Sequence, residues 1–169
     1  MNFKKTNFIS QTKAHHFVIV CAVLFGVSSI SSETPFTSVV AQAAVEPARP
    51  QKFVIKMSHF TDDLHAAVMG LKLANSLLKK GQDVTFFFNL ESVRLVDKRS
   101  NADLSWGKHA TSLLKLYEDA VAAGAKVIVC PHCAEAAGLK AENLRQGAKM
   151  GDEASIAELL IQADKVIDY

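Results

Sequence analysis

Two cysteines three residues apart, Cys130 and Cys133, have the clearest chemical potential in this chain. In residues 126–138 an apolar Val-Ile-Val run leads into Cys130-Pro131-His132-Cys133 and then into helix-favouring residues. This order predicts a buried strand that delivers Cys130 to the start of a helix, because proline is tolerated in a first helical turn. Unpaired backbone N–H groups and the helix dipole favour the thiolate there, which is the form that attacks sulfur. We therefore expect a nucleophilic Cys130, with Cys133 within disulfide reach and His132 able to stabilise the thiolate.

The same Cys-x-x-Cys pair permits a dithiol–disulfide oxidoreductase of the thioredoxin type. That fold carries its motif after an early strand and places a later proline opposite it. Here the motif comes late, and no proline follows Pro131. A purely structural role, in which both thiols pack a strand against a helix as small apolar groups, is a further alternative.

Metal binding is the third interpretation of the pair. The two cysteines and His132 would need His59 or His65 to complete a Cys₂His₂ set. A single Cys-x-x-Cys without a second paired motif indicates a metal site only weakly. The sequence therefore predicts no metal and no other cofactor, and a non-catalytic Cys/His module that binds a metal or ligand stays open.

Alternating strand and helix patterns must position these residues. Because strands and helices alternate along the chain, we expect an α/β protein, a three-layer α/β/α sandwich with a mostly parallel sheet of about five strands. Reactive groups in such sheets lie beyond the carboxyl ends of the strands, so Cys130 and the loop 58–63 are expected to face each other. The predicted strands are 52–57, 84–88, 127–130, 148–150 and 165–169, and the predicted helices are 64–80, 112–123, one starting at 133–137, and 152–163.

Several side chains in this pattern receive structural roles. Thr61 or Asp62 is expected to cap the first helix, and the acidic pair Asp62-Asp63 to compensate its dipole. In the last helix, Asp152 is the expected cap, and the apolar positions 156, 159 and 160 are expected to face inward. Trp106 and residues 86–88 are interpreted as core or oligomer-interface residues, and His109 as an exposed or capping residue.

The N-terminal part has the pattern of a secretory signal. Three lysines within residues 4–13 precede an apolar run at 17–30, and Ala41-Gln42-Ala43 supplies a small-residue cleavage pattern. The apolar run is shorter than the roughly 20 residues that span a membrane. We therefore predict a signal peptide over residues 1–43 and a periplasmic or secreted protein with no membrane association after cleavage. An uncleaved N-terminal anchor is the alternative.

Beyond the predicted cleavage point, residues 44–51 read as a linker with two prolines, and residues 52–169 as one domain. The whole chain has 19 basic and 17 acidic residues, and three lysines and one glutamate precede residue 44, which leaves 16 of each. This balance leaves no basic patch for nucleic acid. An apolar fraction of 49% is typical of a globular chain.

Four segments carry a resemblance to a known family: KFVIKMSHFTDD, LLKKGQDVTFFF, GAKVIVCPHCAEAAGL and the final ENLRQGAKMGDEASIAELLIQADKVIDY. With them, residues 52–169 resemble the DsrE/DsrF/TusD-like sulfur-relay proteins. The resemblance implies an α/β sandwich, assembly into homotrimers or homohexamers, and a persulfide on the cysteine that matches Cys130. It also implies a small sulfur donor or a partner sulfur-carrier protein.

The chain departs from the family pattern at three points. Several carriers have alanine where this chain has Cys133, and many relatives have arginine where it has Ala137. The well-understood relays also lack an export signal. The resulting hypothesis is an exported persulfide carrier or sulfurtransferase that acts through Cys130.

Overall fold

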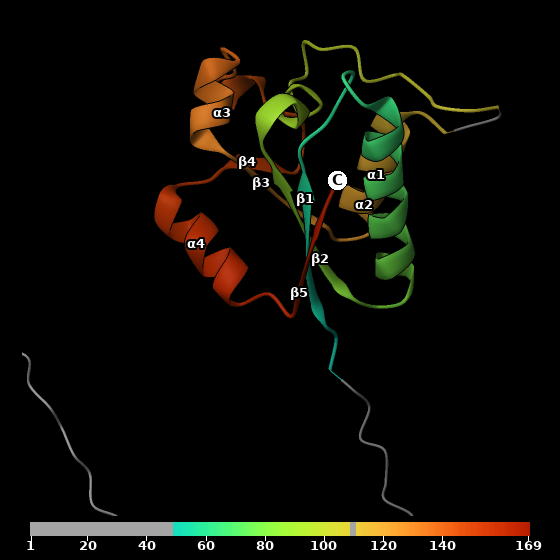
Figure 1. Cartoon of the computed structure of the whole chain (residues 1–169), viewed down its shortest axis with the longest axis vertical. Helices are drawn as coiled ribbons and strands as arrows, with labels where there is room; N and C mark the ends of the chain where they lie inside the picture. Colours follow the sequence, from blue (N-terminus) through green and yellow to red (C-terminus); the bar gives the residue numbers. More distant parts are fainter. Residues whose placement is uncertain (1–48, 109–110) are drawn as a thin grey trace, which may run out of the picture. The chain divides into compact units, whose positions relative to one another are not determined.

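The computed structural model describes residues 49–108 and 111–169 (Figure 1). The predicted signal peptide 1–43 and the position of His109 lie outside these residues. Within the described ranges, no helix combines the length and the apolar character needed to cross a membrane.

A sheet of five parallel strands, in the order β4-β3-β2-β1-β5, forms the centre of the described part. This confirms the predicted α/β sandwich, and all of the strand pairs are parallel. The strands are β1 (Lys52–Met57), β2 (Asp83–Phe88), β3 (Lys126–Val129), β4 (Ala148–Met150) and β5 (Lys165–Asp168); the helices are α1 (Leu64–Lys79), α2 (Leu113–Ala122), α3 (Pro131–Ala136) and α4 (Glu153–Ile161), with short 3₁₀ helices at Leu90–Arg94 and Ala141–Asn143.

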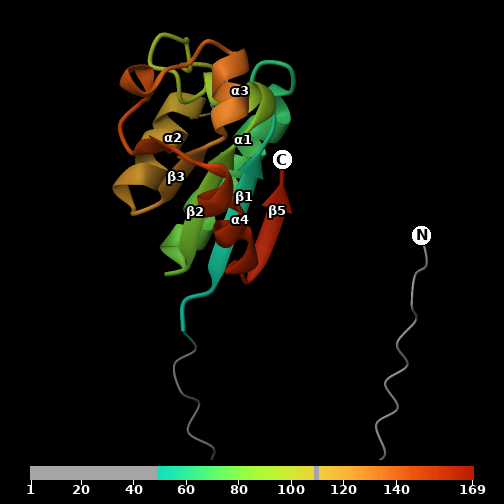
Figure 2. The same ribbon diagram turned by 90° about the vertical axis from the view of Figure 1, so that its left-hand side faces the viewer.

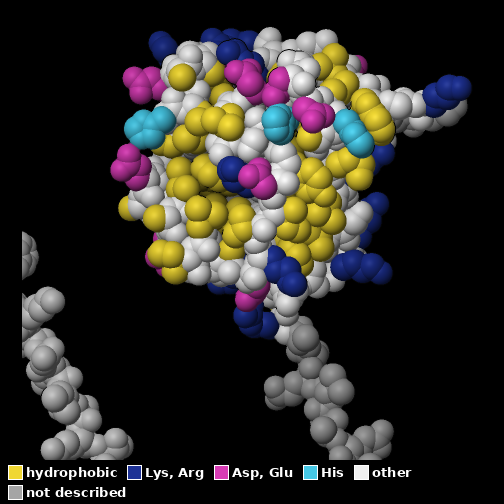
Figure 3. All heavy atoms as spheres, viewed as in Figure 1, with side chains coloured by type: hydrophobic (Ala, Val, Ile, Leu, Met, Phe, Trp, Pro, Cys, Tyr) yellow, Lys and Arg dark blue, Asp and Glu magenta, His cyan; other side chains and the backbone are white. Residues whose placement is uncertain are grey.

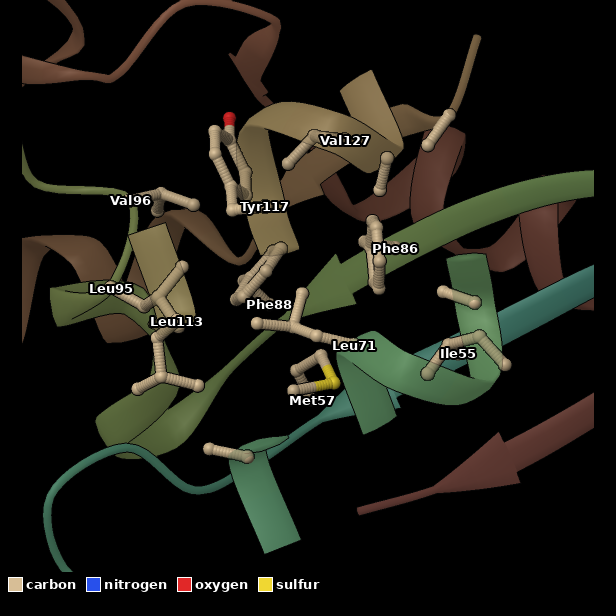
Figure 4. Close-up of a cluster of buried hydrophobic side chains, with 14 of the residues drawn as sticks. Ile55, Met57, Leu71, Phe86, Phe88, Leu95, Val96, Leu113, Tyr117 and Val127 are labelled. Atoms are coloured by element: carbon tan, nitrogen blue, oxygen red, sulfur yellow. The ribbon is translucent and has the colours of Figure 1, made fainter. Parts of the chain in front are cut away.

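The main core lies between the sheet and the helices α1 and α2. Alternate residues of β1 and β2 point to this face, because side chains of a strand alternate between its two sides. The largest buried side chains of this core are Phe86 and Phe88 of β2 and Tyr117 of α2. They share one cluster with Leu71 of α1 (Figure 4). Phe86 and Phe88 thus belong to this core, and Phe87 between them is also buried, so residues 86–88 are core residues as the sequence indicates. Each large side chain buried here contributes about 1.5–3 kcal/mol.

The helix α4 lies on the opposite face of the sheet, with α3 above it near the carboxyl ends of the strands, as the two ribbon views show (Figures 1 and 2). The steps β1 to β2 to β3 run in one direction, whereas α4 returns from β4 at one edge to β5 at the other. Right-handed crossovers in opposite directions place their helices on opposite faces of a parallel sheet.

The helix α4 has no fully buried residue. The prediction that three of its apolar residues face inward is wrong for Leu160, which is 39% exposed, while Ile156 and Leu159 are half-buried. The helix α3 contacts α4 only at its first turn, through His132 and Glu153, among the contacts seen in the described part, and the later turns with Leu160 stay exposed. Hydrophobic side chains are correspondingly visible over α4 and beside β5 in Figure 3.

Helix caps were predicted correctly at one of two helices. Asp152 caps α4 and accepts a hydrogen bond from the Ser155 N–H at 2.8 Å. The cap of α1 is Asp63, which accepts from the Ala66 N–H at 2.9 Å, and not Thr61 or Asp62. Asp62 accepts hydrogen bonds within its own loop instead, which makes it unavailable to the helix.

Arg49 is bound to the domain at the amino end of the sheet. Its guanidinium makes a bidentate pair with Asp164, at 2.9 and 2.7 Å, just before β5. The same carboxylate accepts the Lys52 N–H at 2.8 Å. Arg49 and the start of β1 are thus bound to the start of β5, since bidentate arginine–carboxylate pairs fix geometry as well as charge.

Candidate functional site

Cys130 lies at the junction of β3 and α3, as predicted. Its N–H donates to the Phe88 carbonyl at 2.8 Å, which continues the ladder to β2. Its carbonyl accepts the Ala134 N–H at 3.0 Å, so the residue is already the N-cap of α3 and the strand ends one residue earlier than expected. Pro131 occupies the first helical turn. The sequence therefore places this thiol correctly at the carboxyl edge of the sheet.

The two thiols are free and half-buried. Burial raises the pKa of the Cys133 thiol, and its hydrogen bond with Cys130 raises it further, while the backbone N–H of Leu90 acts in the opposite direction. The raised pKa keeps Cys133 in its protonated form, which is a poor nucleophile because the thiolate is the form that attacks.

A small cavity of about 180 Å³, called the thiol hollow below, opens beside Cys133. Its lining comes from the 3₁₀ helix after β2 and from α3: Leu90, Glu91, Arg94, Cys133, Ala136 and Ala137. A larger hollow of about 450 Å³ beside α2 contains neither cysteine, so size alone would have pointed away from the thiols.

Leu90 has a positive φ of 46°, the left-handed region that leucine rarely adopts. Its side chain is 61% exposed, so burial does not compensate for this conformation. The fully buried Ser92 stabilises the turn at Leu90. Its hydroxyl donates to the Met57 carbonyl and accepts the Asn89 N–H at 3.1 Å. These bonds fix the chain where it borders the thiols.

A second cavity of about 510 Å³, the polar hollow, lies on the other side of Leu90. Lys56 donates to Asp168 at 2.6 Å, and the Ser58 hydroxyl lies 3.1 Å from the same carboxylate and 3.0 Å from Asn89 Oδ1. The bond to Lys56 is the main reason why the pKa of Asp168 is lowered. The polar hollow is lined by Lys56, Ser58, His59, Ala66, Leu90, Asp168 and Tyr169.

His59 is paired within its own loop. Its Nδ1 lies 2.6 Å from Asp62 Oδ2, and this hydrogen bond raises the pKa of His59. Burial opposes ionisation of Asp62, but the Phe60 N–H and His59 together lower the pKa of this carboxyl. The expectation that Cys130 and loop 58–63 face each other in one site is not met, because Ser58 and His59 line the polar hollow and Leu90 borders both cavities.

His132 points toward α4 and is paired there. Its Nε2 lies 3.0 Å from Glu153 Oε1, and 72% of its side chain is exposed. This contact links α3 to the first turn of α4. A role for His132 in stabilising the Cys130 thiolate stays a prediction.

The histidines proposed as metal ligands do not gather at the cysteines. His65 stacks on Trp106, with ring centroids 3.8 Å apart, and Trp106 is 46% exposed and not in the core. Across residues 49–108 and 111–169, no three His, Cys, Asp or Glu side chains are placed to hold a metal ion. The Cys₂His₂ alternative thus finds no support in the described part.

Two site residues, Leu90 and Arg94, were missed from the sequence. The long connection after β2 does stand out, since loops of this length are commonly functional. Nothing in a leucine, however, signals a positive φ, and an arginine in a polar segment is unremarkable. A strand end followed by Asn and Ser at a capping spacing was the available signal.

Comparison with known families decides the affiliation of this fold and site. The family described as DsrE/DsrF-like matches residues 51–169. The chain belongs to the DsrE/DsrF-like family. The match covers every strand of the sheet and both cysteines of the site.

Individual relatives agree with this membership. An uncharacterized protein, MJ0989, of Methanocaldococcus jannaschii is 27% identical over 118 residues, which is 70% of this chain and 99% of the relative. The crystal structure of the ychN protein from E. coli matches with a TM-score of 0.57 at 22% identity, over 70% of this chain and 99% of the other. The protein of unknown function MTH1491 from Methanobacterium thermoautotrophicum matches with a TM-score of 0.54 at 11% identity and the same coverage. At such identities the two structures support the DsrE-like fold alone.

Proposed function

We propose that this DsrE/DsrF-like protein is an exported sulfur carrier or sulfurtransferase that holds a persulfide on Cys130. The observation that carries the proposal is the pair of free, half-buried thiols where β3 meets α3, with Cys130 as the N-cap of the helix. Family membership supports a sulfur-relay role. The predicted signal over residues 1–43 is the basis for export, to the periplasm or the exterior.

The loading step needs one nucleophile and a donor that carries a persulfide sulfur. The Cys130 thiolate attacks the terminal sulfur of the donor, a new S–S bond forms on Cys130, and the donor S–S bond breaks. The donor thiolate leaves with the electron pair, so no external oxidant is needed. Transfer to an acceptor thiolate repeats the exchange with Cys130 as the leaving group.

Cys133 gives the carrier a second outcome. Its thiolate can attack the inner sulfur of the Cys130 persulfide, which forms a Cys130–Cys133 disulfide and releases hydrosulfide. The raised pKa of Cys133 keeps this reaction slow near neutral pH, because the thiolate is then scarce. A loaded carrier would therefore persist long enough to meet a partner sulfur-carrier protein.

Intact mass after incubation with a persulfide donor tests the proposal. We expect a gain of one sulfur in the unchanged protein, no gain in Cys130→Ala, and a longer-lived gain in Cys133→Ala. The variant His59→Ala, in the polar hollow, is the matched control and should load normally. Loading on Cys133 alone, or on neither cysteine, would overturn the assignment of Cys130.

The contact between the two thiols also favours a second candidate, a dithiol–disulfide oxidoreductase. This function requires a Cys130–Cys133 reduction potential in the range of known protein oxidants, about −120 to −180 mV. Equilibration with glutathione buffers measures it. A potential far below that range, together with persulfide loading, favours the carrier.

We propose further that the protein is a homotrimer or homohexamer, as its family resemblance implies. The apolar surface of α4 and β5 supports self-association, since Ile161 is 78% and Val166 49% exposed. Native mass spectrometry of the unchanged protein and of Ile161→Asp tests this. A monomer in both samples would contradict it.

A further inference from the structure

The thiol hollow contains one ion pair. Arg94 Nε donates to Glu91 Oε2 at 2.8 Å, and both side chains are about half exposed, at 47% and 54%. A guanidinium has five N–H donors in a fixed fork. Among the residues that the structure describes, the terminal amino groups of Arg94 have no partner. Donors for an anion are thus available at the wall of the hollow that contains Cys133.

The size of the hollow limits what it can hold. A volume of about 180 Å³ corresponds to about six waters at their share of liquid volume, roughly 30 Å³ each. The remaining walls are the apolar side chains of Leu90, Ala136 and Ala137. A small anion fits this space.

Charge balance decides which end of a ligand faces which wall. Arg94 is the one cation that lines the hollow among the described residues, and Glu91 is the one carboxylate. An anionic group therefore belongs on the free edge of the guanidinium, away from Glu91. The opposite end of the ligand then faces Cys133.

We propose that the thiol hollow is a binding subsite for a small anion that carries a transferable sulfane sulfur, of the thiosulfate class, with Arg94 as its positioning residue. The proposal rests on the sulfur-carrier function and names the class of its donor. The oxyanion group lies on Arg94, and the sulfane sulfur lies at Cys133, the thiol that lines the hollow and contacts Cys130.

The transfer from such a donor balances without another reagent. The Cys130 thiolate attacks the sulfane sulfur and forms the persulfide S–S bond. The bond from the sulfane sulfur to the sulfonate sulfur breaks, and sulfite leaves with the electron pair. Arg94 offsets the repulsion between a dianionic donor and an anionic thiolate, which otherwise disfavours their approach.

A pair of alkylating reagents tests the anion subsite without any sulfur transfer. Iodoacetate and iodoacetamide differ in charge and little in size, so the ratio of their rates at the thiols reports anion recognition. In the full-length protein we expect Arg94→Gln to lower this ratio about fivefold and Glu91→Gln to raise it by a similar factor, as expected for charge-assisted contacts. Arg94→Lys keeps the charge and should restore most of the ratio.

Lys72→Gln is the matched control, because this exposed lysine on α1 carries the same charge and lies outside the hollow. It should leave the ratio unchanged. Equal changes in Lys72→Gln and Arg94→Gln would indicate a general charge effect and overturn the proposal. No rise in Glu91→Gln would also overturn it.

The donor class is tested by loading with two reagents, thiosulfate and the neutral dimethyl trisulfide, followed by intact mass. Thiosulfate adds one sulfur atom and releases sulfite, whereas the trisulfide leaves a methyl disulfide or methyl trisulfide on the cysteine and releases methyl persulfide or methanethiolate, so the two adducts differ in mass. We expect thiosulfate to load the unchanged protein, and the thiosulfate-to-trisulfide ratio to fall about fivefold in Arg94→Gln. Loading by the trisulfide but not by thiosulfate overturns this inference and leaves the carrier function standing. Loading by neither reagent contradicts the carrier function itself.

Discussion

The thiol hollow and the polar hollow share one edge of the sheet and one bordering residue, Leu90, yet they differ in how their polar groups are satisfied. In the polar hollow, Lys56 is bound to Asp168 and His59 to Asp62. In the thiol hollow, one ion pair lies beside the sulfur of Cys133, a weak hydrogen-bonding group. In the polar hollow, charged side chains therefore pair with one another and stabilise the loops. In the thiol hollow, the reactive group is a thiol, which is less polar than any of those side chains.

The difference also shows why the two cavities do not merge. Leu90 is kept at its positive φ by the buried bonds of Ser92, and its exposed side chain lies between the cavities. Strained backbone of this kind, costing roughly 1–2 kcal/mol, persists where the surrounding structure determines it and is frequent at functional sites. Substitutions at this boundary, or in one hollow alone, test whether the two hollows are separate.

The largest effect is expected for Ser92→Ala, which removes the support of the boundary. Its loss leaves the Met57 carbonyl and the Asn89 N–H with weakened bonding in the core, at a cost of about 2 kcal/mol. Urea unfolding measures this. Ser76→Ala, at an exposed serine of α1, is the control and should change the free energy of unfolding by less than about 0.5 kcal/mol. Equal losses of unfolding free energy in the two variants would show that Ser92 stabilises the protein no more than an exposed serine does.

Leu90→Gly should open the boundary. Glycine adopts positive φ without strain, and the missing side chain exposes the thiols, so we expect bulky maleimides to react about tenfold faster. Leu90→Ala also removes the shield but keeps the strain, and should unfold about 1 kcal/mol more easily than Leu90→Gly. Unchanged maleimide rates in both variants would mean that Leu90 does not separate the hollows.

The third expectation concerns pH and the polar hollow alone. The hydrogen bond to Asp62 raises the pKa of His59, so its stabilising contribution is complete below the ordinary histidine value of about 6.5. This contribution is lost as the pH rises through the higher folded value. Asp62→Asn should return the pKa of His59 toward the ordinary value, as followed by NMR titration. Thiol alkylation should not follow that titration; a shared inflection would join the two hollows.

Asp168→Asn should have the smallest effect. Lys56 lowers the pKa of Asp168, so the stability from this pair is present above the ordinary value of about 3.9 and is lost as the pH falls through the lower folded value. Because 58% of the Asp168 side chain is exposed, we expect less than about 1 kcal/mol at neutral pH. Unfolding of Asp168→Asn, Lys56→Gln and the double variant at pH 3 and 7 measures the pair. Additive losses would show that no coupling exists.

Much of the fold was predictable because its causes are local. Apolar residues at helical spacing marked α1 and α2, and Cys130 was placed correctly because a short apolar run ends just before Pro131. The cap at Asp152 followed from a single residue type at a helix start. Each of these features depends on a few neighbours in the chain.

The parts that were missed depend on contacts between distant segments. The exposure of Leu160 depends on which elements pack around the later turns of α4, which the pattern of α4 does not encode. The approach of Arg94 to Cys133 joins residues 39 positions apart through the sheet order. The positive φ of Leu90 follows from the bonds of Ser92 to β1 and not from the type of residue.

The bidentate bond between Arg49 and Asp164 fixes where the domain can be attached to something else. It holds the start of β1 at the amino edge of the sheet, whereas Cys130 and Cys133 follow the carboxyl end of β3. A fusion protein or solid support attached before Arg49 would therefore be joined to the domain at the amino edge of the sheet. The edge of the sheet that carries the two cysteines would then lie opposite the attachment point and stay accessible to partners in solution.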